Sequence, residues 1–225
     1  MAKKDIKDSI EIIESPEALA KEVSNIENLL KKNSKMIYGL VGIIILGAAA
    51  YFGNKYYQNS QAEEGEKELF KAVYSFEADS LTKANQELLS VSDNYGGSAQ
   101  NLADFYLGAS YLKQGRFNEA IEKLKNFSSG DLLLQARAYS LIGDAYMENK
   151  SYSEAISYYQ KAAEYRENKF FTPGYLVKLA IAYEANNNIE DAINAYAKII
   201  EDFPNSAEIG LAKKYKSMLE GSIQE

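Results

Sequence analysis

The side chains that most often carry enzyme chemistry are missing from this sequence. It contains no His and no Cys, which removes the commonest general base, the commonest metal ligand and the thiol nucleophile. We find no phosphate-binding loop, no nucleophile elbow and no pair of acids whose spacing implies catalysis. Ser/Lys or carboxylate chemistry would remain, but no motif supports it. The sequence therefore predicts a protein that is not an enzyme and that uses no cofactor and no catalytic metal.

The densest acidic cluster is residues 63–68, Glu-Glu-Gly-Glu-Lys-Glu. It lacks the alternating Asp and Asn ligands and the defined loop of a calcium site. Acids are favoured near the positive end of a helix dipole. We therefore interpret the cluster as the solvated first turn of a helix rather than as a cation site.

Overall charge excludes one class of partner. The net charge is −7 and the pI about 4.9, and no basic face stands out, so binding to nucleic acid is not expected. The absence of Cys suits an exported domain, although it does not require one. The charge and composition therefore leave proteins and the membrane as the interaction partners to consider.

The longest uncharged stretch runs from Met36 to Phe52. As a helix, its roughly 17 residues would extend about 26 Å, which is the short end of what spans a bilayer core. We predict a transmembrane anchor over 36–52, followed by an aromatic and polar stem over 53–62. Two alternatives are a buried core helix of a soluble protein and a signal peptide, whose cleavage after Ala50 stays open.

Lysines on one side of this stretch predict the topology. Lys31, Lys32 and Lys35 precede it, whereas only Lys55 is near on the other side. Because Lys and Arg stay on the cytoplasmic side during insertion, residues 1–35 are expected to be a cytoplasmic tail. Residues after about 54 would then be periplasmic, and the protein would be a single-pass component of a bacterial inner membrane.

Within the tail, Ser15, Pro16 and Glu17 are typical of a helix start. Apolar residues follow at spacings of 4, 3 and 4, which places them on one side of the predicted amphipathic helix: Leu19, Val23, Ile26 and Leu30. This stripe could pack on a second copy, on the inner membrane surface or on a cytoplasmic partner, or could remain without a partner.

The remainder of the chain contains repeats. Segments 102–124, 137–159 and 174–196 align at offsets of 35 and 37 residues. A small residue, a Tyr and an Ala recur at equivalent positions: Gly108, Gly143 and Ala180, then Tyr111, Tyr146 and Tyr183, then Ala120, Ala155 and Ala192. A weaker unit precedes them and places Ala84 in the register of Ala120.

This pattern predicts stacked helix hairpins. A small residue on each helix lets the two axes approach, while large residues fill the flanks. One hairpin cannot bury its apolar faces alone, so several stack into a solenoid. We expect an all-α domain over 63–220, closed by a capping helix over 206–219, and a short tail over 221–225.

The repeats resemble the tetratricopeptide repeat, which has small, Tyr, Ala and Pro residues at fixed offsets. The early Trp of that pattern is replaced by Asp104, Tyr139 and Leu176. The order of tail, span, stem and repeats also resembles YfgM-type ancillary subunits of the Sec translocon. This resemblance implies periplasmic repeats that bind translocon subunits, a periplasmic chaperone or secretory polypeptides.

In tetratricopeptide solenoids the first helices of the units line a concave face that binds peptides. Carrying those positions over gives a predicted partner-binding face of eleven residues: Leu102, Phe105, Ala109, Leu112, Arg137, Ser140, Asp144, Met147, Val177, Ile181 and Glu184. The face is largely apolar and contains two acids, which favours a hydrophobic or basic peptide, or a partner helix, over a C-terminal carboxylate. Alternatively, the chain is a scaffold of another envelope machine, assembled as a homo-oligomer.

Overall fold

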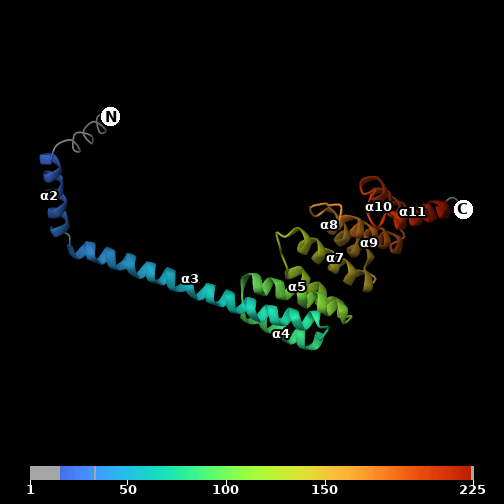
Figure 1. Cartoon of the computed structure of the whole chain (residues 1–225), viewed down its shortest axis with the longest axis horizontal. Coiled ribbons are helices and arrows are strands. Elements are labelled where there is room, and N and C mark those ends of the chain that lie inside the picture. Colours follow the sequence, from blue (N-terminus) through green and yellow to red (C-terminus); the bar gives the residue numbers. More distant parts are fainter. Residues whose placement is uncertain (1–15, 33, 224–225) are drawn as a thin grey trace. The chain divides into compact units, whose positions relative to one another are not determined.

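The computed structural model describes residues 16–32 and 34–223, and all regular structure in these residues is helical (Figure 1). The chain divides into two compact units, residues 1–59 and residues 60–225. The second unit is a solenoid of helix pairs of the tetratricopeptide type, which confirms the predicted all-α repeat architecture.

The first unit contains helix α2 (Pro16–Lys32), which begins at the Pro that the sequence indicated. Leu19, Val23 and Ile26 are 44 to 58% exposed, so these three residues of the predicted stripe are open, while the side chain of Leu30 lies outside the described part of the structure. Helix α3 (Ser34–Glu77) follows, and the stem predicted over 53–62 lies inside it.

In the parts of the chain that the structure describes, no helix is both long enough and apolar enough to cross a membrane. The prediction of a transmembrane helix over 36–52 is therefore not supported. The uncharged stretch of α3 is shorter, at roughly 26 Å, than the ~30 Å thickness of a hydrocarbon core.

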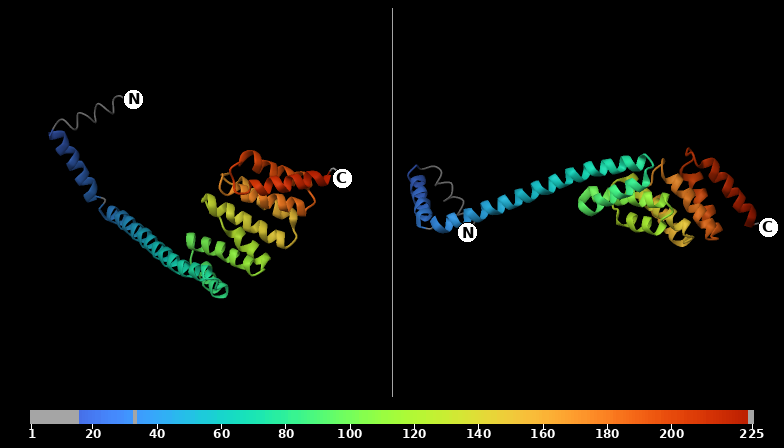
Figure 2. Two further views of the ribbon diagram at one scale, coloured as in Figure 1. Left: turned by 45° about the vertical axis from the view of Figure 1, so that its right-hand side comes forward. Right: turned by 90° about the horizontal axis from the view of Figure 1, so that it is seen from below.

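In the second unit, antiparallel helices form successive pairs, and each pair packs on the next (Figure 2). The last part of α3, from Ser60, pairs with α4, and three clusters of buried apolar residues follow one another along the pairs as far as a single last helix, α11. The bounds are α4 (Leu81–Asn94), α5 (Gly97–Lys113), α6 (Phe117–Asn126), α7 (Leu132–Glu148), α8 (Tyr152–Glu164), α9 (Thr172–Ala185), α10 (Ile189–Asp202) and α11 (Ile209–Ile223).

Small residues lie where the two helices of a pair cross, as the repeat spacing predicts. A Cβ atom added to Gly108 would lie 2.4 Å from Cγ of Leu124, and one added to Gly143 would lie 2.6 Å from Cε1 of Tyr159. Ala180, at the same position of the next pair, is fully buried. The large side chain of the second helix thus occupies the space that a first-helix side chain would need.

The turns inside the pairs share one backbone conformation. Asp79, Gly115, Lys150 and Asn187 follow one another at the repeat spacing, and all have φ between +56° and +73°. Only one of these four residues is Gly, the residue that adopts this left-handed region without steric cost. The geometry of the pair, rather than the residue type, therefore imposes the turn.

A buried ion pair replaces the Trp of the tetratricopeptide pattern in α5. Lys123 of α6 donates to the Asp104 carboxylate at 3.0 Å, and Ser92 of α4 donates to it at 2.9 Å. The Asp104 side chain is only 9% exposed, and a charge this far from water is tolerated when it is paired and hydrogen-bonded. This cluster joins three consecutive helices.

The structure predicts opposite effects for Ala at two helical glycines. Gly143→Ala should lower the free energy of unfolding by about 1–3 kcal/mol, because the buried Tyr159 ring cannot retreat from the new methyl group. Gly210→Ala, on the open side of α11, should raise it by up to about 1 kcal/mol through helix propensity. Urea unfolding followed by circular dichroism measures both; equal effects would contradict the crossing geometry.

Candidate functional site

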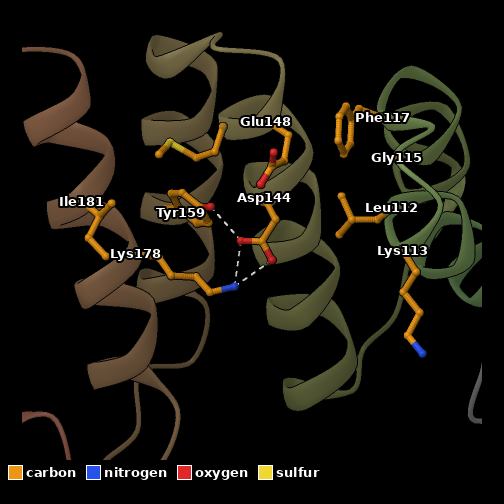
Figure 3. A pocket seen from close by; sticks show the side chains of 10 residues that line it. Leu112, Lys113, Gly115, Phe117, Asp144, Glu148, Tyr159, Lys178 and Ile181 are labelled. Atoms are coloured by element: carbon orange, nitrogen blue, oxygen red, sulfur yellow. Dashed lines mark hydrogen bonds and ion pairs between the residues drawn. The ribbon is translucent and has the colours of Figure 1, made fainter.

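The groove that we assign as the candidate site lies across three successive helix pairs of the second unit (Figure 3). Its volume is about 520 Å³. We call it the concave groove, and its lining comes from the ends of α5 and the start of α6, from α7 and α8, and from α9: Leu112, Lys113, Gly115, Phe117, Asp144, Met147, Glu148, Tyr159, Lys178 and Ile181.

A three-helix polar cluster stands at the centre of the groove. The Asp144 carboxylate on α7 accepts hydrogen bonds from the Tyr159 hydroxyl of α8 and from Lys178 Nζ of α9, each at 2.7 Å. Lys178 also donates to Ser140 Oγ at 3.2 Å. The cluster therefore connects one helix pair to the first helix of the next.

Tyr159 remains a hydrogen-bond donor at any physiological pH. Its side chain is 3% exposed, and burial, together with the negative charge of Asp144, raises the pKa of its hydroxyl far above the usual value. The buried Tyr159 hydroxyl consequently fixes the orientation of the Asp144 carboxylate.

The Asp144–Lys178 pair is still accessible from the groove. The two side chains are 26% and 41% exposed, so a ligand can reach the remaining acceptor and donor positions. Because the ammonium group is already paired with a carboxylate, it is a poor anchor for a free C-terminal carboxylate. Backbone amides of a bound peptide suit this centre better.

Apolar side chains surround the polar cluster. In Figure 3, Leu112 and Phe117 lie on one side of Asp144, and Ile181, with 46% of its surface exposed, lies on the other side. Met147 also lines the groove. Such a combination of apolar walls and a few convergent polar groups is typical of sites that bind one or two apolar side chains of a ligand.

Of the eleven residues predicted to face a partner, four line this groove: Leu112, Asp144, Met147 and Ile181. Phe105 and Ser140 are 5% and 3% exposed and lie in the interior, where the Phe105 ring packs 5.0 Å from that of Phe127. A partner cannot touch these two side chains unless the helices move.

The other five predicted residues lie outside the groove lining. Arg137 is exposed on α7, and Glu184 accepts a hydrogen bond from the Tyr196 hydroxyl at 2.9 Å. The remaining three are half-buried on α5 and α9: Leu102, Ala109 and Val177.

Sequence reasoning missed Tyr159 and Lys178. A signal for Lys178 was present, because the aligned repeats carry Tyr106 and Leu141 at its position and a lysine is out of place in an apolar first helix. Tyr159 offered no such signal, since Leu124 and Tyr196 occupy the same position in the neighbouring repeats and the pattern predicts all three to be core residues.

Comparison with known proteins identifies the repeats. Residues 105–169 and 175–206 match the tetratricopeptide repeat, so the chain carries repeats of this type. Over 123 residues the chain is 28% identical to the uncharacterized protein ycf37 of Guillardia theta, and the alignment covers 52% of this chain and 67% of ycf37.

Solved structures agree at the level of the fold. MamA (residues 41 to the end) from Desulfovibrio magneticus RS-1 superposes with a TM-score of 0.51 at 20% identity, covering 61% of this chain and 74% of MamA. A MamA variant gives 0.52 at 19% identity, with 70% and 83% covered. At these identities the likeness concerns the fold alone.

The ion pair in the groove should contribute measurably to stability. In a double-mutant cycle with Asp144→Asn and Lys178→Met, we expect a coupling of about 1 kcal/mol, the upper end for partly exposed pairs, because Ser140 and Tyr159 hold both groups. The matched control is Glu167–Lys198, a 3.0 Å pair with side chains 43% and 40% exposed, which should couple less. Chemical denaturation of the single and double variants measures both; a larger control coupling would count against a fixed polar centre.

Proposed function

We propose that this tetratricopeptide-repeat chain is a non-enzymatic binding module that holds an apolar segment of a partner protein in the concave groove. One observation carries the proposal: Leu112, Met147 and Ile181 surround an accessible, self-neutralised ion pair on three successive first helices. The partner segment we infer is a peptide or helix with one or two large apolar side chains, whose backbone amides meet Asp144.

Ile181 gives the scale of binding through the groove. Fully burying an Ile side chain contributes about 1.5–3 kcal/mol, and about half of Ile181 is still exposed. A partner that buries this exposed half should therefore gain about 1 kcal/mol of binding free energy. Ile181→Ser should therefore weaken partner binding by about 5- to 10-fold. The folded state should change little.

In-cell photo-cross-linking tests the groove. Photoreactive residues at Met147 and Ile181 should capture a protein that a photoreactive residue at Glu122 or Ser157 does not, because those two side chains are exposed on the second helices of the pairs. Ile181→Ser introduced beside the Met147 probe should lower the captured yield. Equal capture from Glu122, or no capture from either groove position, would refute the proposed groove.

We further propose that the module is held at a membrane, with the Sec translocon as its site of action. Two observations support a membrane location: Ile43, Ile44 and Leu46 are 66 to 71% exposed, and the helix around them is apolar on every side, which suits contact with lipid. The Lys residues before this stretch favour repeats on the periplasmic side.

Membrane fractionation tests this location. We expect the chain to stay in the pellet after alkaline carbonate extraction, and Ile44→Lys combined with Leu46→Lys to release it, because charge inside a hydrocarbon layer is costly. The matched control is Val23→Lys combined with Ile26→Lys on α2, which should remain in the pellet. Release of the unaltered chain by carbonate would overturn the membrane proposal. If the chain stays in the pellet, co-purification of translocon subunits from mild detergent tests the Sec translocon as the site of action.

A scaffold in another envelope assembly is the second candidate. The open stripe on α2 favours it, because Leu19, Val23 and Ile26 would be covered by a second copy in an oligomer. Two masses measured in detergent, that of the full chain and that of its Val23→Ser, Ile26→Ser variant, distinguish the oligomeric scaffold from the binding module. Dissociation of an oligomer by this change favours the scaffold.

A further inference from the structure

The first helix of the solenoid exposes a position that every later pair buries. In repeat register, Tyr74 of α3 corresponds to Ser110, Ala145 and Ala182, which are all fully buried. Tyr74 itself is 69% exposed. In later pairs, the side of the first helix that carries this position packs on the preceding pair. In α3 the same side has no preceding pair of the second unit against which to pack.

An exposed aromatic pair marks that side. Phe70 and Tyr74 lie one helical turn apart and are 76% and 69% exposed, whereas Leu69 and Ala72 on the opposite side are buried. Glu63 and Glu66 lie beside Phe70, and Lys67 lines the same shallow hollow. We call these four exposed residues, Glu63, Glu66, Phe70 and Tyr74, the leading face.

The last helix of the solenoid has an exposed apolar stripe of its own. Leu211 and Met218 are 39% and 58% exposed, and Lys214 lies between them on the same side of α11. Ala212, which packs inward, is fully buried. These three residues, Leu211, Lys214 and Met218, form what we call the trailing face, and Lys213 is exposed on the adjoining side of α11.

The two faces carry opposite charge. Residues 60–77 contain five acids and two lysines, a net charge of −3, while Ile209–Ile223 contains three lysines and one acid, a net charge of +2. Each face therefore offers large apolar side chains beside charges that the other face can neutralise, which favours their association over association of like faces.

We propose that the trailing face of one copy docks on the leading face of a second copy, so that α11 takes the place of a preceding helix pair. The contact is heterologous, because each copy uses a different face on its two sides. It therefore generates a ring or an open row of copies rather than a closed symmetric dimer. This assembly is independent of the concave groove.

Cysteine cross-linking between two differently tagged copies tests the proposal, because the chain itself contains no Cys. Tyr74→Cys and Met218→Cys, each in one full-length copy, should give a mixed cross-linked dimer with a short bifunctional maleimide in cells. Cells that make two copies of the same single variant should give none. Mixed cross-links that are absent, or no stronger than those between like variants, or capture of an unrelated protein at Tyr74→Cys in place of a second copy, would overturn the proposal.

Matched substitutions identify the contribution of the face itself. Phe70→Ser with Tyr74→Ser should lower the cross-linking yield between Glu77→Cys and Met218→Cys copies at least 10-fold, while Phe170→Ser should leave it unchanged, since Phe170 is equally exposed (74%) on a distant loop. Lys213→Glu with Lys214→Glu should also abolish the product. Adding Glu63→Lys and Glu66→Lys to the other copy should restore it; failure of this rescue, or persistence of the product without the aromatic pair, would refute head-to-tail docking.

Discussion

The close approach of two helices at a position without a side chain is the constraint on which this solenoid depends. At Gly108 and Gly143 the second helix fills the space of an absent Cβ with Leu124 and Tyr159. These large side chains then extend to the next pair, so the crossing inside one pair also determines where the following pair can pack. The stack, and the groove along it, follow from a contact repeated at one sequence spacing.

Two polar clusters of similar chemistry are built on this framework, and water access separates their roles. Asp104, 9% exposed, is held by Lys123 and Ser92 and offers a ligand much less surface than Asp144 does. Asp144, 26% exposed, is held by Tyr159 and Lys178 yet opens into the groove. A carboxylate fixed by a buried donor but reachable from solvent is suited to binding, because a partner meets a group that needs little reorganisation.

A feature of this structure could be predicted from the sequence when it is periodic along the chain. The helix pairs, their small crossing residues and the start of α2 at Pro16 could be predicted, because they follow from repeat spacing and from local capping rules. The polar centre of the groove could be predicted only in part, since Lys178 departs from its repeat and Tyr159 conforms to it. Phe105 was placed on a surface that Phe127 covers, because helical periodicity gives a face but not the loop that packs on it.

The turns show how far packing overrides local preference. A residue other than Gly in the left-handed region costs roughly 1 kcal/mol, yet Asp79, Lys150 and Asn187 all adopt it where the second pair has Gly115. The cost recurs in three pairs, and in each it is offset by the burial of an Ala on the second helix at 0% exposure. Since a turn of another shape would move that helix away from the small residue opposite it, the left-handed residue is a consequence of the crossing. The same reasoning explains why the turn sequences differ so widely between pairs while the crossing residues stay small.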